Sequence, residues 1–269
     1  MNKKCKRVGC YEPADCRHGY CKNHCGKRHE KYDYSCRVYP KSRVPHVGVE
    51  IEVIYSNDQD LRRGVSGLKA HHDASLGAYG AEYKVLGPAS KIVKRASSLL
   101  HILWCRRAKI TPKCGLHVHL DAREAQSSRL EQLFAWAYAT QDTWFGLVPP
   151  SRRENCYCAK LMGPKTPWNH HAWINKSGHN TVEVRLHSGT LNPHKMAGWL
   201  EVLKHVQKKF LDNDYTFPTE GEGVDKFWKL FEDAPKVARE YLQTRLNNGG
   251  LLKDYAYQPN EEVLEVAHV

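Results

Sequence analysis

The sequence lacks any long run of apolar residues. No window approaches the roughly 18 to 20 consecutive apolar residues that a membrane-spanning helix needs. No apolar signal-peptide core follows the charged residues 1–7 either. We therefore expect a cytoplasmic protein without a membrane partner. Thiols stay reduced in that compartment, so the 10 cysteines indicate metal binding or buried thiols rather than disulfides.

Acidic residues are scarce relative to basic ones, 29 against 41, and the net charge is +12. The imbalance is concentrated in residues 1–43, which hold twelve basic and four acidic residues and so contribute +8. The remaining 226 residues contribute only +4. A hydrophobic content of 41% excludes a disordered chain, and the length fits one sizeable core with a small appendage.

Residues 1–43 nearly lack Val, Ile and Leu, yet they hold six of the 10 cysteines. Such a segment cannot build an apolar core, so we expect a bound metal to order it. Three thiolates and one imidazole complete a closed structural Zn²⁺ site. The spacing that supplies them is Cys5-x4-Cys10-x10-Cys21-x2-His24. We predict a zinc-binding module at 1–43, similar to small zinc modules of phage proteins, and a catalytic domain at 44–269.

Two features of that module stay open. Cys16 or Cys25 could replace one of the four ligands, and all of these cysteines could also be ordinary reduced thiols. The surrounding Lys and Arg residues fit contact with nucleic acid or another acidic partner. They fit equally well a role that only solvates a small domain.

Four segments alternate apolar and polar residues with a period of two, as half-buried strands do. Their polar positions are Glu50 and Glu52 in 46–54; Glu82 and Lys84 in 80–86; His117, His119 and Asp121 in 115–121; and Thr181, Glu183, Arg185 and His187 in 181–187. One such strand alone also fits an ordinary solvent-facing surface. Paired in one sheet, the four would line a concave face with the four glutamates and the imidazoles of His117 and His119. That crowding requires cations, and Mg²⁺ both prefers oxygen ligands and bridges to phosphate, so we predict a metal–phosphate site.

Amphipathic helical patterns separate and follow these segments. They cover 90–109, 123–139, 195–211 and 224–245, the last as two short helices. Their apolar stripes are expected to pack on the apolar face of the sheet. The predicted fold class is therefore α+β, an antiparallel sheet with a polar face open to substrate and helices behind it.

Four motifs carry a resemblance to a known family. They are GVEIE at 48–52, DASLGAYGAE at 73–82, CGLHVHL at 114–120 and NTVEVRLHSGT at 180–190. In this order, over about residues 44–210, they resemble the amidoligase family of the carboxylate–amine ligase superfamily, which includes glutamine synthetase and glutamate–cysteine ligase. No Walker-type glycine-rich loop is present, which agrees with that superfamily.

The resemblance implies a glutamine synthetase-like catalytic fold and an ATP-dependent ligase that forms an amide through an acyl phosphate. The implied cofactors are ATP and Mg²⁺, beside the structural Zn²⁺, and the implied substrates carry a carboxylate and an amine on an amino acid, peptide or protein. The implied Mg²⁺ ligands are Glu50, Glu52, Glu82, His117 and Glu183. The implied phosphate contacts are His119, Arg152, Arg153 and Arg185. The implied catalytic residues are Glu50, Glu52, Glu82, Glu183 and Arg185.

Other functions remain compatible with the same residues. His117 and His119 with the carboxylates could form the site of a metal-dependent hydrolase or nuclease. A non-catalytic, zinc-containing protein that binds nucleic acid is a second alternative, and transfer of a phosphoryl or nucleotidyl group is a third. The segment 154–179 fits no family motif, and both a surface loop and a substrate lid are compatible with it.

Overall fold

The computed structural model describes residues 44–57, 70–167 and 169–250. Cys5, Cys10, Cys21 and His24 lie outside the described residues, so the zinc module and its boundary with the catalytic domain stay predictions. The described elements are, in order, β1 (His46–Ile54), β2 (His71–His72), η1 (Ala74–Leu76), β3 (Gly80–Pro88), α3 (Ile92–Cys105), β4 (Gly115–Asp121), α4 (Ser127–Gly146), α5 (Pro150–Arg153), η2 (Cys156–Cys158), β5 (Ile174–Lys176), β6 (Thr181–Ser188), α6 (Pro193–Leu211), α7 (Gly223–Leu230) and α8 (Lys236–Asn247). Among these described helices, none combines the length and apolar character needed to cross a membrane.

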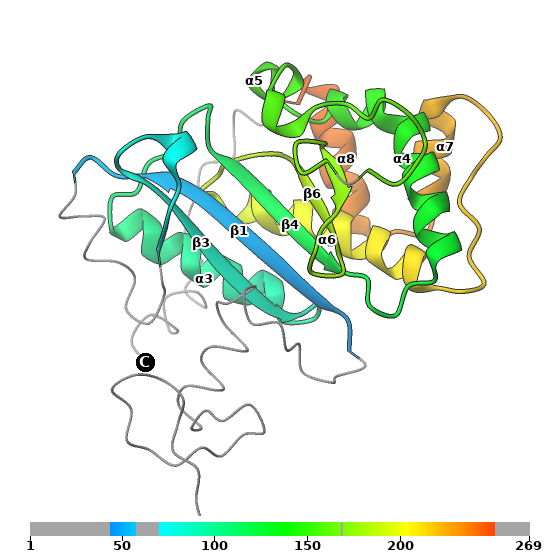
Figure 1. The fold of residues 1–269 in the computed structure, drawn as a ribbon, viewed down its shortest axis with the longest axis horizontal. Helices are drawn as coiled ribbons and strands as arrows, with labels where there is room; N and C mark the ends of the chain where they lie inside the picture. Colours follow the sequence, from blue (N-terminus) through cyan, green and yellow to red (C-terminus); the bar gives the residue numbers. More distant parts are fainter. Residues whose placement is uncertain (1–43, 58–69, 168, 251–269) are drawn as a thin grey trace, which may run out of the picture.

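The strands form one six-stranded sheet in the order β2-β3-β1-β4-β6-β5 (Figure 1). Every neighbouring pair is antiparallel. The long central strands β1, β3, β4 and β6 are the four segments whose alternation predicted strands. The fold class is a mixed α/β arrangement around an antiparallel sheet, as the sequence indicated.

Helices α3 and α6 cover one face of the sheet, behind the strands as Figure 1 is drawn. The alternate residues of β1 that point toward them, Val47, Val49, Ile51 and Val53, are completely buried. Both helices lie where the apolar stripes predicted them. The core therefore occupies the space between the sheet and these two helices, and the polar positions of the strands lie on the opposite face.

A second group of helices, α4, α7 and α8, packs beside α6. The approach of α8 to α6 is close, since a Cβ atom on Gly198 of α6 would lie 2.2 Å from Cδ2 of Tyr241. Aromatic side chains fill the centre of this group, with Trp144 of α4 in contact with rings from α6 and α7. The segment 224–245 forms two short helices, as predicted.

A β-bulge in β6 corrects one sequence prediction. Leu116 of β4 pairs with His187 and Val118 pairs with Val184, so two residues of β6, Arg185 and Leu186, oppose one residue of β4. The extra residue shifts the alternation by one position. His187 therefore does not share the polar face with Glu183 and Arg185. Its ring is completely buried and packs against Trp199 of α6 at a centroid distance of 5.2 Å.

His187 is held as a neutral imidazole on the helical side. Its Nε2 lies 2.6 Å from Nη2 of Arg245 and 2.9 Å from the hydroxyl of Tyr241, while its Nδ1 lies 2.5 Å from the carbonyl of Ser188. Since arginine can only donate, Nε2 accepts and Nδ1–H donates to the carbonyl. Burial, and then the positive charge of Arg245, hold the pKa of His187 well below its usual value.

We expect this histidine to destabilise the protein at mildly acidic pH. The other charges acting on it, Arg152 and Lys195, are also positive, so the folded state keeps the ring neutral. The unfolded chain takes up a proton below about pH 6.5, and stability falls as pH decreases below that value. Chemical denaturation at about pH 7 and about pH 5.5 should show a drop about 1 kcal/mol larger in the wild type than in His187→Gln. Equal drops in both proteins would contradict a neutral, buried His187.

Candidate active site

The pairing of the strands places their polar positions in adjacent rows on the open face of the sheet. The central row crosses β3, β1 and β4 and consists of Lys84, Glu50 and His117. Directly paired positions on neighbouring antiparallel strands have Cβ atoms about 5 Å apart. Glu50 therefore has a cation on one side and an imidazole on the other.

Two flanking rows complete the face. On one side, Glu82 of β3 pairs with Glu52 of β1 and with His71 of β2. On the other side, Glu183 of β6 pairs with His119 of β4 and with Asn175 of β5. The sheet thus brings together the four predicted glutamates and the two predicted histidines.

The side chains on this face are buried although they carry charge. Glu50, Glu52 and Glu183 are 7%, 6% and 5% exposed, and His117 and His119 are 3% and 5% exposed. Buried carboxylates are costly unless cations or hydrogen-bond donors compensate them. The arrangement therefore requires neutralising partners close to the carboxylate oxygens.

His119 is oriented from behind by a hydroxyl group. Its Nδ1 lies 2.9 Å from Oγ1 of Thr181, which lies 2.7 Å from Oγ of Ser177. Its Nε2 is then directed between two carboxylates, 3.5 Å from Oε1 of Glu50 and 3.7 Å from Oε1 of Glu183. A fixed second nitrogen of this kind is the usual support for a histidine that binds a metal ion.

His117 lies between the two glutamates of β1. Its Nδ1 is 3.5 Å from Oε2 of Glu50 and its Nε2 is 3.4 Å from Oε1 of Glu52. Within the described residues, the buried Nδ1 atom has no hydrogen-bond partner. A buried polar nitrogen in this state is costly, and a metal ion would satisfy it.

The electrostatics of the face favour ionised carboxylates at its centre. Burial acts to raise the pKa of Glu50, but His119, His117 and Lys84 together hold that pKa well below its usual value. The pKa of Glu183 is lowered in the same way, against burial, by the charges of His119 and Arg185. Conversely, burial acts to lower the pKa of His119, but Glu50 and Glu183 outweigh burial, so this pKa is raised.

The pKa values of Glu82 and Lys84, both on β3, are raised. Burial, followed by the negative charge of Glu50, raises the pKa of Glu82 to about 7, although Lys84 acts against this. Burial acts to lower the pKa of Lys84, but Glu50 and Glu82 outweigh it and raise that pKa. Lys84 is therefore a permanent cation within the carboxylate cluster.

Three groups on this face have ligand atoms close enough to hold a metal ion. The first consists of Glu50, His119 and Glu183; the second of Glu50, Glu82 and His117; and the third of Glu52, Asp73 and Glu82. Within each group, the ligand atoms lie within 4.8 Å of one another. Each group offers two or three carboxylates and at most one imidazole, a donor set that suits a hard ion such as Mg²⁺.

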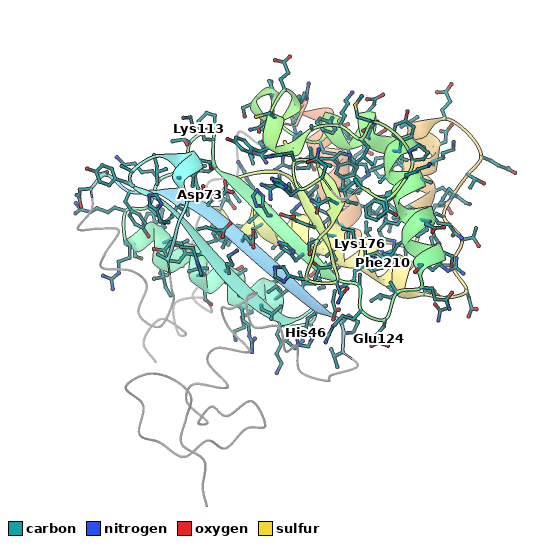
Figure 2. All side chains as sticks on the ribbon, in the orientation of Figure 1. His46, Asp73, Lys113, Glu124, Lys176 and Phe210 are labelled. Atoms are coloured by element: carbon teal, nitrogen blue, oxygen red, sulfur yellow. The ribbon has the colours of Figure 1, made fainter. Side chains whose placement is uncertain are left out.

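Asp73 belongs to the third group, and the sequence did not identify it as a ligand. It precedes the short helix η1, and its Oδ1 accepts hydrogen bonds from the backbone N–H and hydroxyl of Ser75. This turn leads into β3 and directs Asp73 toward Glu52 and Glu82; Figure 2 labels Asp73 beside β1 and β3. The available signal was the Asp-x-Ser sequence before a strand, which is typical of a capped turn.

The three predicted arginines have different positions. Arg185 borders the glutamate cluster, with Nη1 2.6 Å from Oε1 of Glu183 and Nε donating to the carbonyl of Tyr157. Arg152 is 1% exposed and donates to the carbonyls of Arg185 and Leu186, the two residues of the bulge. It therefore supports the backbone from which Arg185 extends.

Arg153 makes its contacts away from the sheet face. Its guanidinium donates to the carbonyls of Phe145, Val148 and Gly249, and so joins the end of α4 to the residues after α8. The structure does not bring Arg153 together with the glutamates. Phosphate binding by Arg152 or Arg153 stays a prediction.

Part of the segment 154–179 contributes to the site directly. Residues Ile174–Lys176 form β5 at the edge of the sheet, and Asn175 is 1% exposed. Its Nδ2 donates to Oε2 of Glu183 at 3.1 Å. No local pattern indicated this contact, because a three-residue strand is too short to show alternation.

We expect Gly115→Ala to weaken binding of divalent ions. A Cβ atom at this position would lie 2.6 Å from Nε2 of His117, so the imidazole would have to move. Displacing a residue that orients a ligand typically lowers metal affinity about 10- to 100-fold. Titration with Mn²⁺ measures this, and Gly163→Ala is the matched control because no atom lies within 4 Å of its added Cβ. The effect acts through Glu52 of the third group, whose Oε1 lies 3.4 Å from Nε2 of His117, so unchanged affinity in Gly115→Ala would show that His117 does not orient this ligand.

Comparisons with known proteins found similarity in structure rather than in sequence. No protein-family model matches the sequence, and no curated protein matches it. Among solved structures, the chain is similar to one described as "Apo GmaS without ligand", with 15% sequence identity and a TM-score of 0.45. That similarity covers 84% of this chain and 72% of the other.

Proposed function

We propose that this chain is an ATP-dependent carboxylate–amine ligase that forms an amide or peptide-type bond through an acyl phosphate. The observation that carries the proposal is the convergence of five carboxylates and two imidazoles at the polar face of the sheet, in three groups with metal-ligand spacing. Oxygen-rich groups that share carboxylates are suited to several Mg²⁺ ions and a polyphosphate. The resemblance of the four sequence motifs to the amidoligase family supports the same chemistry.

Specific residues are proposed to hold the cofactors. Glu50 and Glu183 with His119 would bind Mg²⁺ on the β6 side of the sheet, and Glu52 and Glu82 with Asp73 on the β3 side. When bound, Mg²⁺ neutralises charge on the phosphates of ATP and orients them for transfer. The register of the sheet fixes the strand positions from which Glu50, Glu52, Glu82 and Glu183 extend.

Arg185 is proposed to contact the transferred phosphoryl group. Its side chain is 16% exposed and lies at the edge of the buried cluster, next to Glu183. A guanidinium offers several donors in one plane and can bind phosphate oxygens through two of them. Arg152 fixes the bulge beneath it and so acts as a positioning residue.

The proposed reaction has two steps. In the first, a carboxylate oxygen of the substrate attacks the γ-phosphorus of ATP, the bond to the β-phosphate oxygen breaks, and ADP leaves. In the second, the nitrogen of an amine attacks the carbonyl carbon of the acyl phosphate, the carbon–oxygen bond to phosphate breaks, and the amine loses a proton. The products are an amide, ADP and phosphate.

A metal-dependent hydrolase or nuclease is the second candidate, favoured by the group of Glu50, His119 and Glu183, which could also bind a metal and its water. One assay separates the two. The protein is incubated with ATP, Mg²⁺ and pools of amino acids, peptides and amines, and the release of ADP and phosphate is measured. The ligase predicts ADP release that requires both a carboxylate and an amine. Hydrolysis of nucleic acid or an amide that EDTA abolishes, without such ADP release, would favour the hydrolase.

A further inference from the structure

Lys84 places a cation between two carboxylates of the site. Its Nζ lies 2.7 Å from Oε1 of Glu50 and 2.8 Å from Oε1 of Glu82, and its side chain is 21% exposed. The position follows from the backbone, since Lys84 pairs directly with Glu50 across β3 and β1 and stands two residues from Glu82 on the same face. The backbone thus holds the ammonium group of Lys84 next to the carboxylates of Glu50 and Glu82.

The same two carboxylates belong to the second of the three metal groups, whose third member is His117. An ion bound there would need an oxygen from Glu50 and one from Glu82, the two residues that Lys84 already joins. A divalent ion in that space would lie next to the ammonium group, and two cations at such a distance in a buried site repel strongly. Lys84 in its present position and an ion in the second group therefore exclude each other.

The two outer groups are less affected. Each outer group shares only one carboxylate with Lys84: Glu50 in the first group, which also has His119 and Glu183, and Glu82 in the third group, which also has Glu52 and Asp73. Oε1 of Glu50, which accepts from Lys84, also lies 3.5 Å from Nε2 of His119, so an ion in the first group shares this one oxygen with the ammonium group, whereas an ion in the second group would have to share both carboxylates with it. An ion in either outer group therefore still has two ligands besides the carboxylate that it shares with Lys84.

We propose that Lys84 is a built-in cation that substitutes for a metal ion in the second group and limits this face to two divalent ions. Removing its charge opens the second group to a third ion, bound by Glu50, Glu82 and His117. The inference rests on the metal site of the proposed function and concerns only ion number, so it does not depend on which substrates the enzyme uses.

The test counts Mn²⁺ ions bound to the full-length protein without ATP or substrate, by equilibrium dialysis. We expect two ions on this face in the wild type and one more in Lys84→Met, which removes the charge while keeping a similar length. Lys84→Arg keeps the charge and should match the wild type. Lys229→Met is the control for loss of a lysine charge outside the site, because Lys229 is 63% exposed and pairs with Glu232 on the surface. Ions bound elsewhere in the chain contribute equally to every variant and are removed by taking the difference from the wild type.

Folding is checked independently for each variant. Far-UV circular dichroism and thermal melting, with and without Mn²⁺, should show a larger rise in Tm on adding Mn²⁺ for Lys84→Met than for the wild type, because an extra ion stabilises the folded state. Lys84→Gln is a second neutral variant, and it should also bind one additional ion if Lys84→Met does not fold.

Two results would overturn the proposal. Equal ion counts in the wild type and in both neutral variants would show that Lys84 does not control the second group. A third ion on the wild-type face would show that Lys84 moves aside rather than substituting for a metal. Either result leaves ATP-dependent ligation unaffected, and absence of ligation with any substrate pair leaves the ion count unaffected, so the two proposals fail separately.

Discussion

Replacing Glu50 by glutamine is expected to lower ATP-dependent ligation about 1,000-fold or more, which corresponds to about 4 kcal/mol of transition-state stabilisation. Glu50 belongs to two of the three metal groups, and its carboxylate also contacts Lys84 and both imidazoles. Glutamine keeps the shape but loses the charge and one acceptor oxygen. The measurement is the rate of ADP release with a substrate pair identified from the pooled assay.

The fold should survive this substitution, because an amide is less costly to bury than a carboxylate. Glu240→Gln provides the matched control, since Glu240 lies on α8 with 64% of its side chain exposed. We expect the control to keep wild-type activity and both variants to keep the wild-type circular dichroism spectrum. A folded Glu50→Gln protein with more than about a tenth of the wild-type rate would remove Glu50 from the catalytic machinery.

Trp144→Ala is expected to have the largest effect on stability, about 3–5 kcal/mol, because it leaves a large cavity in a packed aromatic core. Trp144 lies on α4 and is 1% exposed, and its ring packs against rings from α6, from α7 and from the residue before β5. Its ring contacts those of Trp136, Trp173, Trp199, Phe227 and Phe231, with centroid distances of 5.3–6.1 Å. A loss of this size is a large part of the stability of a typical domain.

Urea denaturation followed by circular dichroism measures this loss. Trp104→Ala on α3 is the control, because Trp104 is 56% exposed. The control is expected to change the free energy of unfolding by less than about 1 kcal/mol. If the two substitutions had equal effects, the aromatic cluster would not be the main source of stability on this side of the molecule.

Much of the fold was predictable because strands and helices leave different periods in the sequence. The alternation in 46–54 predicted β1 with the bounds that the structure has, and the other three long strands and the helices followed from the same two periods. Glu50 and Glu52 alternate with core residues, so their common face was determined by the strand itself. The resemblance to the amidoligase family selected the same residues.

Other parts of the site depend on contacts that no local pattern records. Asp73 reaches Glu52 and Glu82 only because η1 turns the chain back toward β3. Asn175 reaches Glu183 because three residues of an apparent loop pair with β6. In both cases the element involved is only three residues long, which is too short to show either period.

The order of residues alone predicts which of them lie on the polar face of each straight strand, because side chains on a strand must alternate. Long-range pairing sets where this alternation is interrupted: the bulge in β6 depends on pairing with β4, and it moves His187 into the helical core. Tertiary contacts also separate the side chains of the neighbours Arg152 and Arg153. Arg152 donates to the carbonyl of Arg185 in β6, and Arg153 donates to the carbonyl of Phe145 in α4. The position of Lys84 beside Glu50 also depends on tertiary structure. The register of β1 against β3 joins residues that are far apart in the sequence, and it decides which charged side chains lie next to one another.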